Sequence, residues 1–258
     1  MDYVKILGID IGGSGIKGAP VNVKTGKILE ARHRIPTPEP SSPDNVAQVI
    51  ADIVKHFNWK GPIGCGFPGV IQNGYIRTAA NVDKSWVNVN FNKLLSETTA
   101  LPATVVNDAD AAGLAEMKFG AGKNQKGVVL LLTIGTGIGT VLFTDGRLVP
   151  NVEMGHVQMR GMDAEKYSSD AARKNEDLSW EEWAKRFDEY LNYMQQLLWP
   201  ELIILGGGAS KKGEKFLQHL TVNAKVVLAE LLNNAGLVGA ALAARYQHKL
   251  EKKKARIK

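Results

Sequence analysis

The stretch GIDIGGSGIKG, residues 8–18, places one carboxylate and a cluster of glycines between two apolar segments. The preceding YVKIL is typical of a buried strand, and a glycine turn followed by a second strand predicts a β-hairpin. Glycines allow a backbone to approach a ligand closely, and successive amides in such a turn can bind an anion. The stretch is not a Walker A loop, since no Gly-Lys-Ser or Gly-Lys-Thr follows, and no helix follows directly as in a dinucleotide-binding fingerprint. Taken alone, it is either a glycine-rich hairpin or a phosphate site.

Two later segments repeat this pattern. TIGTGIGT, residues 133–140, joins an apolar strand to a returning strand, and LGGGAS, residues 205–210, ends a strand before a helix. Three glycine turns at three strand ends favour a common phosphate-rich ligand over three unrelated hairpins. The hairpins that begin near residues 4 and 128 also resemble each other, which predicts two similar lobes with a cleft between them.

Strands alternate with helices along the chain, which is typical of an α/β protein. Helices are expected at five places: 43–57, 108–119, from 179 onward, within 212–220, and 235–250. Ser42 and Pro43 mark the start of the first helix, and Ser179 with Glu182 forms a capping box. Residues 157–178 are polar and show no periodicity that assigns them.

The composition is that of an ordinary globular protein, and it excludes several classes of function. The 258-residue chain has a single cysteine, so it has neither an internal disulfide nor a multi-cysteine zinc site. No apolar run is long enough to span a bilayer, and the N-terminus does not resemble a signal peptide, so a cytoplasmic protein without a membrane partner is expected. The net charge of +6 comes partly from the tail KLEKKKARIK, and no nucleic-acid-binding pattern accompanies it.

The segment VVNDADAAG, residues 105–113, carries two aspartates where a strand meets a helix. Asp is favoured at helix N-caps and in first turns, so Asp108 or Asp110 could simply cap the helix. Alternatively, one of these carboxylates takes part in catalysis. The nine residues alone do not decide between the two interpretations.

The order of the glycine turns, together with GFPG at 66–69, NDAD at 107–110 and EMGH at 153–156, resembles the ROK sugar kinases of the actin/hexokinase superfamily. Within that family, AANVDKSW at 79–86 and GHVQMRGMDAEK at 155–166 are similar to the polyphosphate glucokinases. The resemblance implies a two-lobed α/β fold of the ribonuclease-H-like type, with a cleft between the lobes. The small N-terminal lobe would comprise 1–106 and about 240–258, and the large lobe 107–239.

The resemblance also implies an activity, the transfer of a phosphoryl group from inorganic polyphosphate to the 6-hydroxyl of glucose, with ATP as a further candidate donor. One alternative is a strictly nucleotide-dependent ROK kinase for glucose, mannose or a related sugar. A sugar-responsive repressor is the other. Repressors of this family carry a DNA-binding segment before the first phosphate turn, whereas GIDIGG begins at residue 8 of this sequence.

Matching the family motifs assigns Asp108 as the catalytic base that takes the proton of the sugar hydroxyl. Asp110 is then a structural carboxylate of the helix. The residues expected to contact the sugar are Asn81, Asn107, Asp108, Glu153, His156 and Glu165. Glu176 is held in reserve for Glu165, because the alignment is uncertain there.

The donor phosphates are expected to contact glycines, hydroxyls and one lysine of the turns: Asp10, Gly12, Gly13, Ser14, Lys17, Thr133, Gly135, Thr136, Gly137, Gly206 and Gly207. Asp10 matches the family carboxylate that holds Mg²⁺, through water, and Gly206 and Gly207 would border the adenine if ATP binds. A positive track for polyphosphate could draw on Lys84, Lys123, Lys126, Lys166, Arg173, Lys174, Lys211 and Lys212.

Many ROK proteins bind zinc through a cysteine cluster that follows the Gly-His pair. The corresponding positions here read Lys166, Ser168 and Arg173, so the cluster is absent and no zinc is expected at His156. Because ROK kinases are often dimers, the resemblance further implies a homodimer.

Overall fold

The computed structural model describes residues 3–79 and 82–255. The chain forms two compact units. Unit 1 contains residues 1–115 and 234–258, and unit 2 contains residues 116–233. The helix α3 (Asp108–Phe119) crosses the division, so Asp108 belongs to unit 1 and Glu116 to unit 2.

The sheet of unit 1 has the strand order β3-β2-β1-β5-β8, with β4 pairing to β2. Its strands are β1 (Lys5–Gly12), β2 (Gly15–Asn22), β3 (Lys27–Ile28), β4 (His33–Ile35), β5 (Ile63–Phe67) and β8 (Ala103–Asn107). The first strands are antiparallel, whereas β5 and β8 run parallel to β1. A small hairpin, β6 (Ile71–Gln72) and β7 (Tyr75–Ile76), and the helices α1 (Pro43–His56), α2 (Phe91–Thr99) and α8 (Ala235–Ala255) complete the unit.

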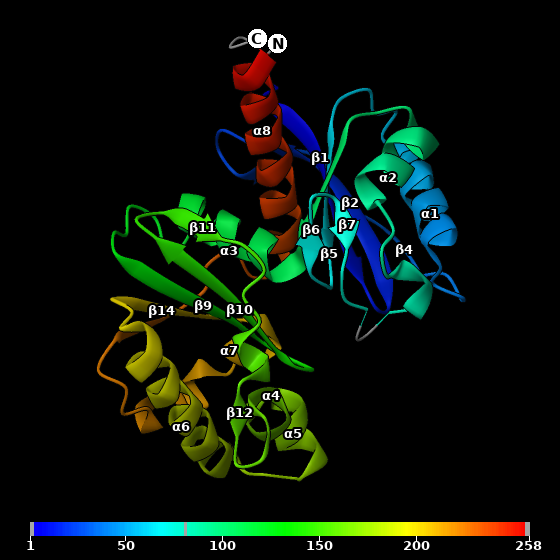
Figure 1. Cartoon of the computed structure of the whole chain (residues 1–258). Helices are drawn as coiled ribbons and strands as arrows, with labels where there is room; N and C mark the ends of the chain where they lie inside the picture. Colours follow the sequence, from blue (N-terminus) through cyan, green and yellow to red (C-terminus); the bar gives the residue numbers. More distant parts are fainter. Residues whose placement is uncertain (1–2, 80–81, 256–258) are drawn as a thin grey trace. The chain divides into compact units, whose positions relative to one another are not determined.

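Helices cover both faces of this sheet. Leu7, Ile9 and Ile11 pack into a buried core with residues of α1 and α2. The alternate residue Gly8 faces α8, where a Cβ would overlap the carbonyl oxygen of Leu237. Glycine in the strands therefore allows α8 to approach β1 and β5 closely, as Figure 1 shows.

The starts of two helices follow the sequence prediction. The Ser42 hydroxyl accepts a hydrogen bond from the Asn45 amide at the beginning of α1, with Pro43 at the first helical position. In unit 2, Ser179 and Glu182 form the expected capping box of α6 (Trp180–Leu198).

Unit 2 contains a five-stranded sheet of order β11-β10-β9-β14-β15. Its strands are β9 (Val128–Ile134), β10 (Ile138–Thr144), β11 (Arg147–Val149), β14 (Leu202–Gly206) and β15 (Lys225–Leu228). The antiparallel and parallel pairings repeat those of unit 1, so both units are a three-stranded meander followed by two parallel strands. The apolar face of α6 packs on this sheet through Trp183, Phe187 and Tyr190.

Residues 157–178, which the sequence does not assign, form short elements. They are the hairpin of β12 (Gln158–Met159) and β13 (Met162–Asp163), followed by α4 (Ala164–Ser168) and α5 (Asp170–Asn175). The Trp183 indole donates to the carbonyls of Ser168 and Ser169 at 3.0 Å each, so α6 fixes the junction of the two helices. Contacts distant in sequence therefore hold this segment.

The prediction of a helix within 212–220 is wrong. The segment forms two 3-10 turns, Gly213–Lys215 and Leu217–His219, after the short helix α7 (Gly207–Ser210). Phe216 lies between the turns and is fully buried against Trp183 and Phe187. The Phe216 backbone has φ −133° and ψ −25°, outside the α-helical region, so the two turns do not join into one helix.

None of the helices in the described part of the chain combines the length and the apolarity that crossing a bilayer requires.

Candidate functional site

The first glycine turn connects β1 to β2 in unit 1. Gly12 pairs with Gly15, which leaves Gly13 and Ser14 as the exposed tip of a two-residue turn. Asp10 lies opposite Lys17 across the two strands, and the Lys17 ammonium is 3.6 Å from the Asp10 carboxylate. Lys17 therefore neutralises Asp10 in this structure rather than adding an unpaired charge to the turn.

Asn107, not either aspartate, caps α3 in unit 1. The Asn107 side-chain oxygen accepts from the Asp110 amide at 3.0 Å, and its NH₂ group donates to the Gly69 carbonyl at 3.2 Å. Asp110 is buried within the helix, as expected for a structural carboxylate. The Asp108 carboxylate accepts a hydrogen bond from the next amide, that of Ala109, at 2.8 Å.

The second and third glycine turns meet in unit 2. Thr133 pairs with Gly206 across β9 and β14, and Ile134 forms a bridge with Gly207. Gly207 has φ +81°, and a Cβ there would overlap the backbone of Ile134, so only glycine fits. The turn Gly135–Gly137 is closed by a hydrogen bond from the Gly135 amide to the Gly137 carbonyl at 3.0 Å. The structure thus brings these two sets of predicted donor residues together.

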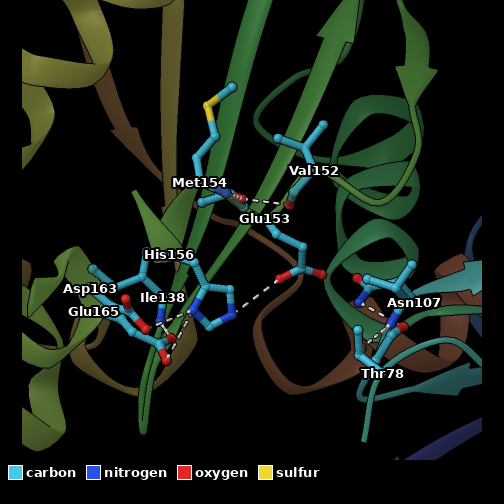
Figure 2. Close-up of polar contacts among 12 residues, drawn as sticks. Thr78, Asn107, Ile138, Val152, Glu153, Met154, His156, Asp163 and Glu165 are labelled. Atoms are coloured by element: carbon cyan, nitrogen blue, oxygen red, sulfur yellow. Dashed lines mark hydrogen bonds and ion pairs between the residues drawn. The ribbon is translucent and has the colours of Figure 1, made fainter. Parts of the chain in front are cut away.

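A buried threonine fixes the segment that carries Glu153. The Thr140 hydroxyl donates to the Val152 carbonyl at 2.7 Å and accepts from the Met154 amide at 2.9 Å. These two bonds hold the backbone on either side of Glu153 against β10, just before the 3-10 turn Met154–His156 (Figure 2).

His156 lies among three carboxylates of unit 2, which Figure 2 shows around its ring. Its Nε2 is 3.9 Å from Glu153, whereas its Nδ1 is 3.4 Å from Asp163 and 3.8 Å from Glu165. Because the His156 side chain is 48% exposed, packing alone does not fix the ring. Its polar neighbours therefore decide where the two nitrogens point.

Glu165 connects this cluster to the second glycine turn. One Glu165 oxygen accepts from the Ile138 amide at 3.2 Å. A Cβ on Gly137 would overlap that carboxylate, so the glycine predicted to bind phosphate also makes room for a predicted sugar ligand. The reserve candidate Glu176 instead pairs with Arg186 at 2.7 Å, which lowers its pKa through that hydrogen bond.

The Glu153 carboxyl has a pKa above the ordinary value of 4.5. Partial burial is the main cause, and the negative charge of Glu165 acts in the same direction, whereas His156 opposes both. Its protonation therefore begins at a higher pH than that of an exposed glutamate.

Several of the predicted track cations already have partners. Asp170 pairs with Arg173 at 2.9 Å and Lys174 at 2.7 Å, and Lys166 lies 3.9 Å from Asp163. The remaining candidates, Lys84, Lys123, Lys126, Lys211 and Lys212, are exposed. Arg173 also stacks over Trp180, which further commits it to the structure.

The described residues include no group of three or more His, Cys, Asp and Glu side chains arranged to hold a metal ion. Mg²⁺ does not require such a cage, because it retains several waters and binds through one or two carboxylates together with substrate phosphates. A partly exposed carboxylate such as Asp10, next to a turn that exposes amides, fits that mode of binding.

One predicted sugar ligand, Asn81, lies outside the described residues. Conversely, the structure reveals residues that the sequence analysis missed: Arg34 at the first turn, and Gln158 and Asp163 beside His156. Asp163 lies inside the GHVQMRGMDAEK segment that carries the resemblance. No local pattern distinguishes Arg34, because its contact with Ser14 depends on strand pairing.

Comparison with known proteins identifies the family. The sequence pattern described as the ROK family matches residues 6–174. A polyphosphate glucokinase of Mycobacterium tuberculosis (strain CDC 1551 / Oshkosh) is 45% identical over 238 residues, which cover 92% of this chain and 90% of the relative. A polyphosphate glucokinase of Mycobacterium leprae is 43% identical over 238 residues, covering 92% of this chain and 74% of the relative.

The fold comparison agrees. The crystal structure of an inorganic polyphosphate/ATP-glucomannokinase from Arthrobacter sp. strain KM superposes with a TM-score of 0.90 at 45% identity, covering 95% of this chain and 100% of the other. A ROK family glucokinase from Streptomyces griseus, 24% identical, shares the fold with a TM-score of 0.76, covering 94% of this chain and 99% of the other. The expected actin/hexokinase-type α/β fold is confirmed, and the chain belongs to the ROK family.

Proposed function

We propose that this chain is a sugar kinase that transfers a phosphoryl group from inorganic polyphosphate to the 6-hydroxyl of glucose. The observation that carries the proposal is the 45% identity to curated polyphosphate glucokinases over nearly the whole chain. The repeated hairpin topology of the two units and the exposed glycine turns support it, because phosphoryl transfer depends mainly on positioning and on neutralising phosphate charge.

In unit 1, Asp108 acts as the general base. Its carboxylate accepts the proton of the glucose 6-hydroxyl as that oxygen bonds to the terminal phosphorus, and the phosphoanhydride bond breaks to release a polyphosphate shorter by one phosphate. Asn107 supports this role because Asn107, and not Asp108, caps α3 through the Asp110 amide. One NH₂ hydrogen of Asn107 remains for a sugar hydroxyl.

In unit 2, Glu153, His156 and Glu165 bind sugar hydroxyls. The Glu153 carboxylate lies 3.9 Å from Nε2 of the His156 ring and the Glu165 carboxylate 3.8 Å from its Nδ1, so the three side chains form one polar cluster. Such a cluster discriminates strongly between sugars, since an unmatched polar group that is desolvated by the ligand is costly.

The three glycine turns bind the donor phosphates through their amides and through the hydroxyls of Ser14, Thr133 and Thr136. When bound at Asp10, Mg²⁺ would neutralise phosphate charge as the bond to the leaving group breaks. Lys17 then exchanges its contact with Asp10 for one with phosphate. Gly206 and Gly207 border the adenine when ATP is the donor.

A coupled assay of glucose 6-phosphate formation tests the proposal. Purified protein is supplied with glucose, Mg²⁺ and either polyphosphate or ATP, and NADPH production by glucose-6-phosphate dehydrogenase is followed. We expect turnover with polyphosphate, and none when polyphosphate is replaced by orthophosphate. Absence of turnover with polyphosphate, with ATP still active, would support the strictly nucleotide-dependent alternative.

A second candidate activity is the use of ATP as donor and of mannose as acceptor. The structural match to a protein described as a polyphosphate/ATP-glucomannokinase favours it. The same assay with ATP tests whether ATP is a donor. Direct detection of mannose 6-phosphate, with mannose as acceptor, tests whether mannose is a substrate.

Two further expectations remain proposals. A homodimer, expected from the resemblance, is tested by sedimentation velocity of the purified chain at several concentrations. A cytoplasmic location is tested by fractionation of cells that express it.

A further inference from the structure

Three charged residues form a row across three strands of unit 1. Asp10 pairs with Lys17 across β1 and β2, and Lys17 pairs with Arg34 across β2 and β4. Residues directly opposite each other share one face of a sheet, and like charges in that position destabilise it. Lys17 has Asp10 as its partner, but no carboxylate forms an ion pair with Arg34 within residues 3–79 and 82–255. The row therefore leaves one positive charge unneutralised.

The Arg34 guanidinium is fixed against the first glycine turn. Its Nη2 donates to the Ser14 carbonyl at 2.5 Å and lies 3.4 Å from the Ser14 hydroxyl. It fills the space beside Gly15, where a Cβ would lie 2.5 Å from the Arg34 Cζ. The nearby Thr37 hydroxyl donates to the Gly12 carbonyl at 2.5 Å. The segment that carries Arg34 thus braces both sides of the turn.

Most of the guanidinium remains available. The hydrogen bonds from Arg34 to Ser14 use only Nη2, whereas a guanidinium has five N–H donors in a planar fork. Arg34 is exposed, and so are Gly13 and Ser14 at the tip of the turn. Exposed amides next to a fixed, unpaired guanidinium form a site for a phosphate group, because this fork matches two phosphate oxygens at once.

We propose that Arg34 binds a phosphate group of the phosphoryl donor, beside the amides of the Gly12–Gly15 turn. The ligand chemistry is a phosphoanhydride chain, which polyphosphate and ATP share. The identity of this ligand rests on the proposed function, whereas the binding of a phosphate chain does not require that glucose be phosphorylated.

The test compares Arg34→Gln, Arg34→Lys and the matched control Lys24→Gln. Lys24 is an exposed lysine in the turn between β2 and β3, beyond the end of β2 that is far from Ser14, so its replacement removes the same charge away from the glycine turn. Donor KM is measured with polyphosphate and separately with ATP, at saturating glucose, and tripolyphosphate binding is measured by calorimetry without glucose. Thermal unfolding establishes that each variant is folded.

We expect Arg34→Gln to raise the donor KM and the tripolyphosphate Kd about tenfold or more, because the variant loses a charge-assisted hydrogen bond to phosphate. The KM for glucose should change less than about twofold. Arg34→Lys should retain part of the affinity, and Lys24→Gln should resemble the wild type. The increase of donor KM with salt should also be shallower in Arg34→Gln.

An unchanged tripolyphosphate Kd in folded Arg34→Gln, or an equal effect of Lys24→Gln, would overturn the proposal. If Arg34→Gln does not fold, the test uses Arg34→Lys. Wild-type affinity of Arg34→Lys for tripolyphosphate would then overturn the claim that the planar guanidinium binds two phosphate oxygens. Failure of the proposed function has a different signature, which is wild-type protein that binds tripolyphosphate but transfers no phosphate to glucose.

Discussion

The Nδ1 of His156 lies 3.4 Å from the Asp163 carboxylate, whose other oxygen accepts a 2.6 Å hydrogen bond from Gln158. Gln158 and Asp163 are directly paired in the β12–β13 hairpin, so a short piece of sheet holds the carboxylate in place. In the neutral imidazole, a carboxylate at Nδ1 favours the tautomer that carries its proton there, so Asp163 orients the His156 ring.

Asp163→Asn should therefore raise the KM for glucose about tenfold, with a smaller effect on kcat, because His156 loses its orientation. Nitrogen-15 NMR of the His156 ring should show the Nδ1–H tautomer in the wild type at alkaline pH and a mixture in the variant. The control Glu214→Gln removes an exposed carboxylate of the same unit. A wild-type ring that is mainly protonated at Nε2 would contradict this interpretation.

The raised pKa of Glu153 predicts that sugar binding depends on pH. Because partial burial raises its pKa above 4.5, protonation begins at a higher pH than in an ordinary glutamate, and the ionised acceptor is lost earlier on acidification. Because His156, Glu165 and Asp163 lie in the same cluster, the comparison is with Glu153→Gln. The wild-type KM for glucose should rise between neutral pH and about pH 5, whereas the already raised KM of the variant should change less. Parallel pH profiles for both proteins would rule out this role.

Asp170 is expected to contribute to the stability of the folded protein in a pH-dependent way. Burial opposes ionisation of this carboxyl, but hydrogen bonds from Lys174 and Arg173 outweigh it and hold the pKa below the ordinary 3.8. Asp170 therefore stabilises the folded protein above about pH 3.8, and this contribution is lost as the pH falls through the folded-state pKa. Asp170→Asn should lower the free energy of unfolding by about 1–3 kcal/mol at pH 7.

Urea unfolding of this variant at pH 7 and near pH 3 measures the effect. The exposed Asp177→Asn serves as the control, since Asn accepts the positive φ of that position. A stability loss in Asp170→Asn that is as large at pH 3 as at pH 7 would show that the ion pairs are not its cause.

Features with local causes could be predicted from the sequence. The capped helices α1 and α6 begin where Ser42 and Ser179 indicate, and the glycine hairpin of β1 and β2 forms as expected. The hairpins near residues 4 and 128 recur in two sheets of the same strand order, because strand alternation and turn residues are both encoded locally.

Features that depend on distant contacts could not. The 157–178 segment is held by Trp183 of α6, and burial of Phe216 breaks the helix expected at 212–220. In the candidate site, the capping role of Asn107 and the pairing of Asp163 with His156 become visible only once the backbone is in place. Residue types predict which chemistry is available, whereas strand register determines which side chains meet.

Replacement of Asp108 tests the central claim most directly. Asp108→Asn keeps the size of the side chain and its contact with the Ala109 amide but removes the base. Turnover of glucose with polyphosphate should fall by about 10² to 10⁴. Glucose binding, measured by calorimetry, should remain within a few-fold of the wild type, and Asp44→Asn, an exposed aspartate of the same unit, should remain fully active. Asp108→Asn protein that turns over at close to the wild-type rate would contradict the account.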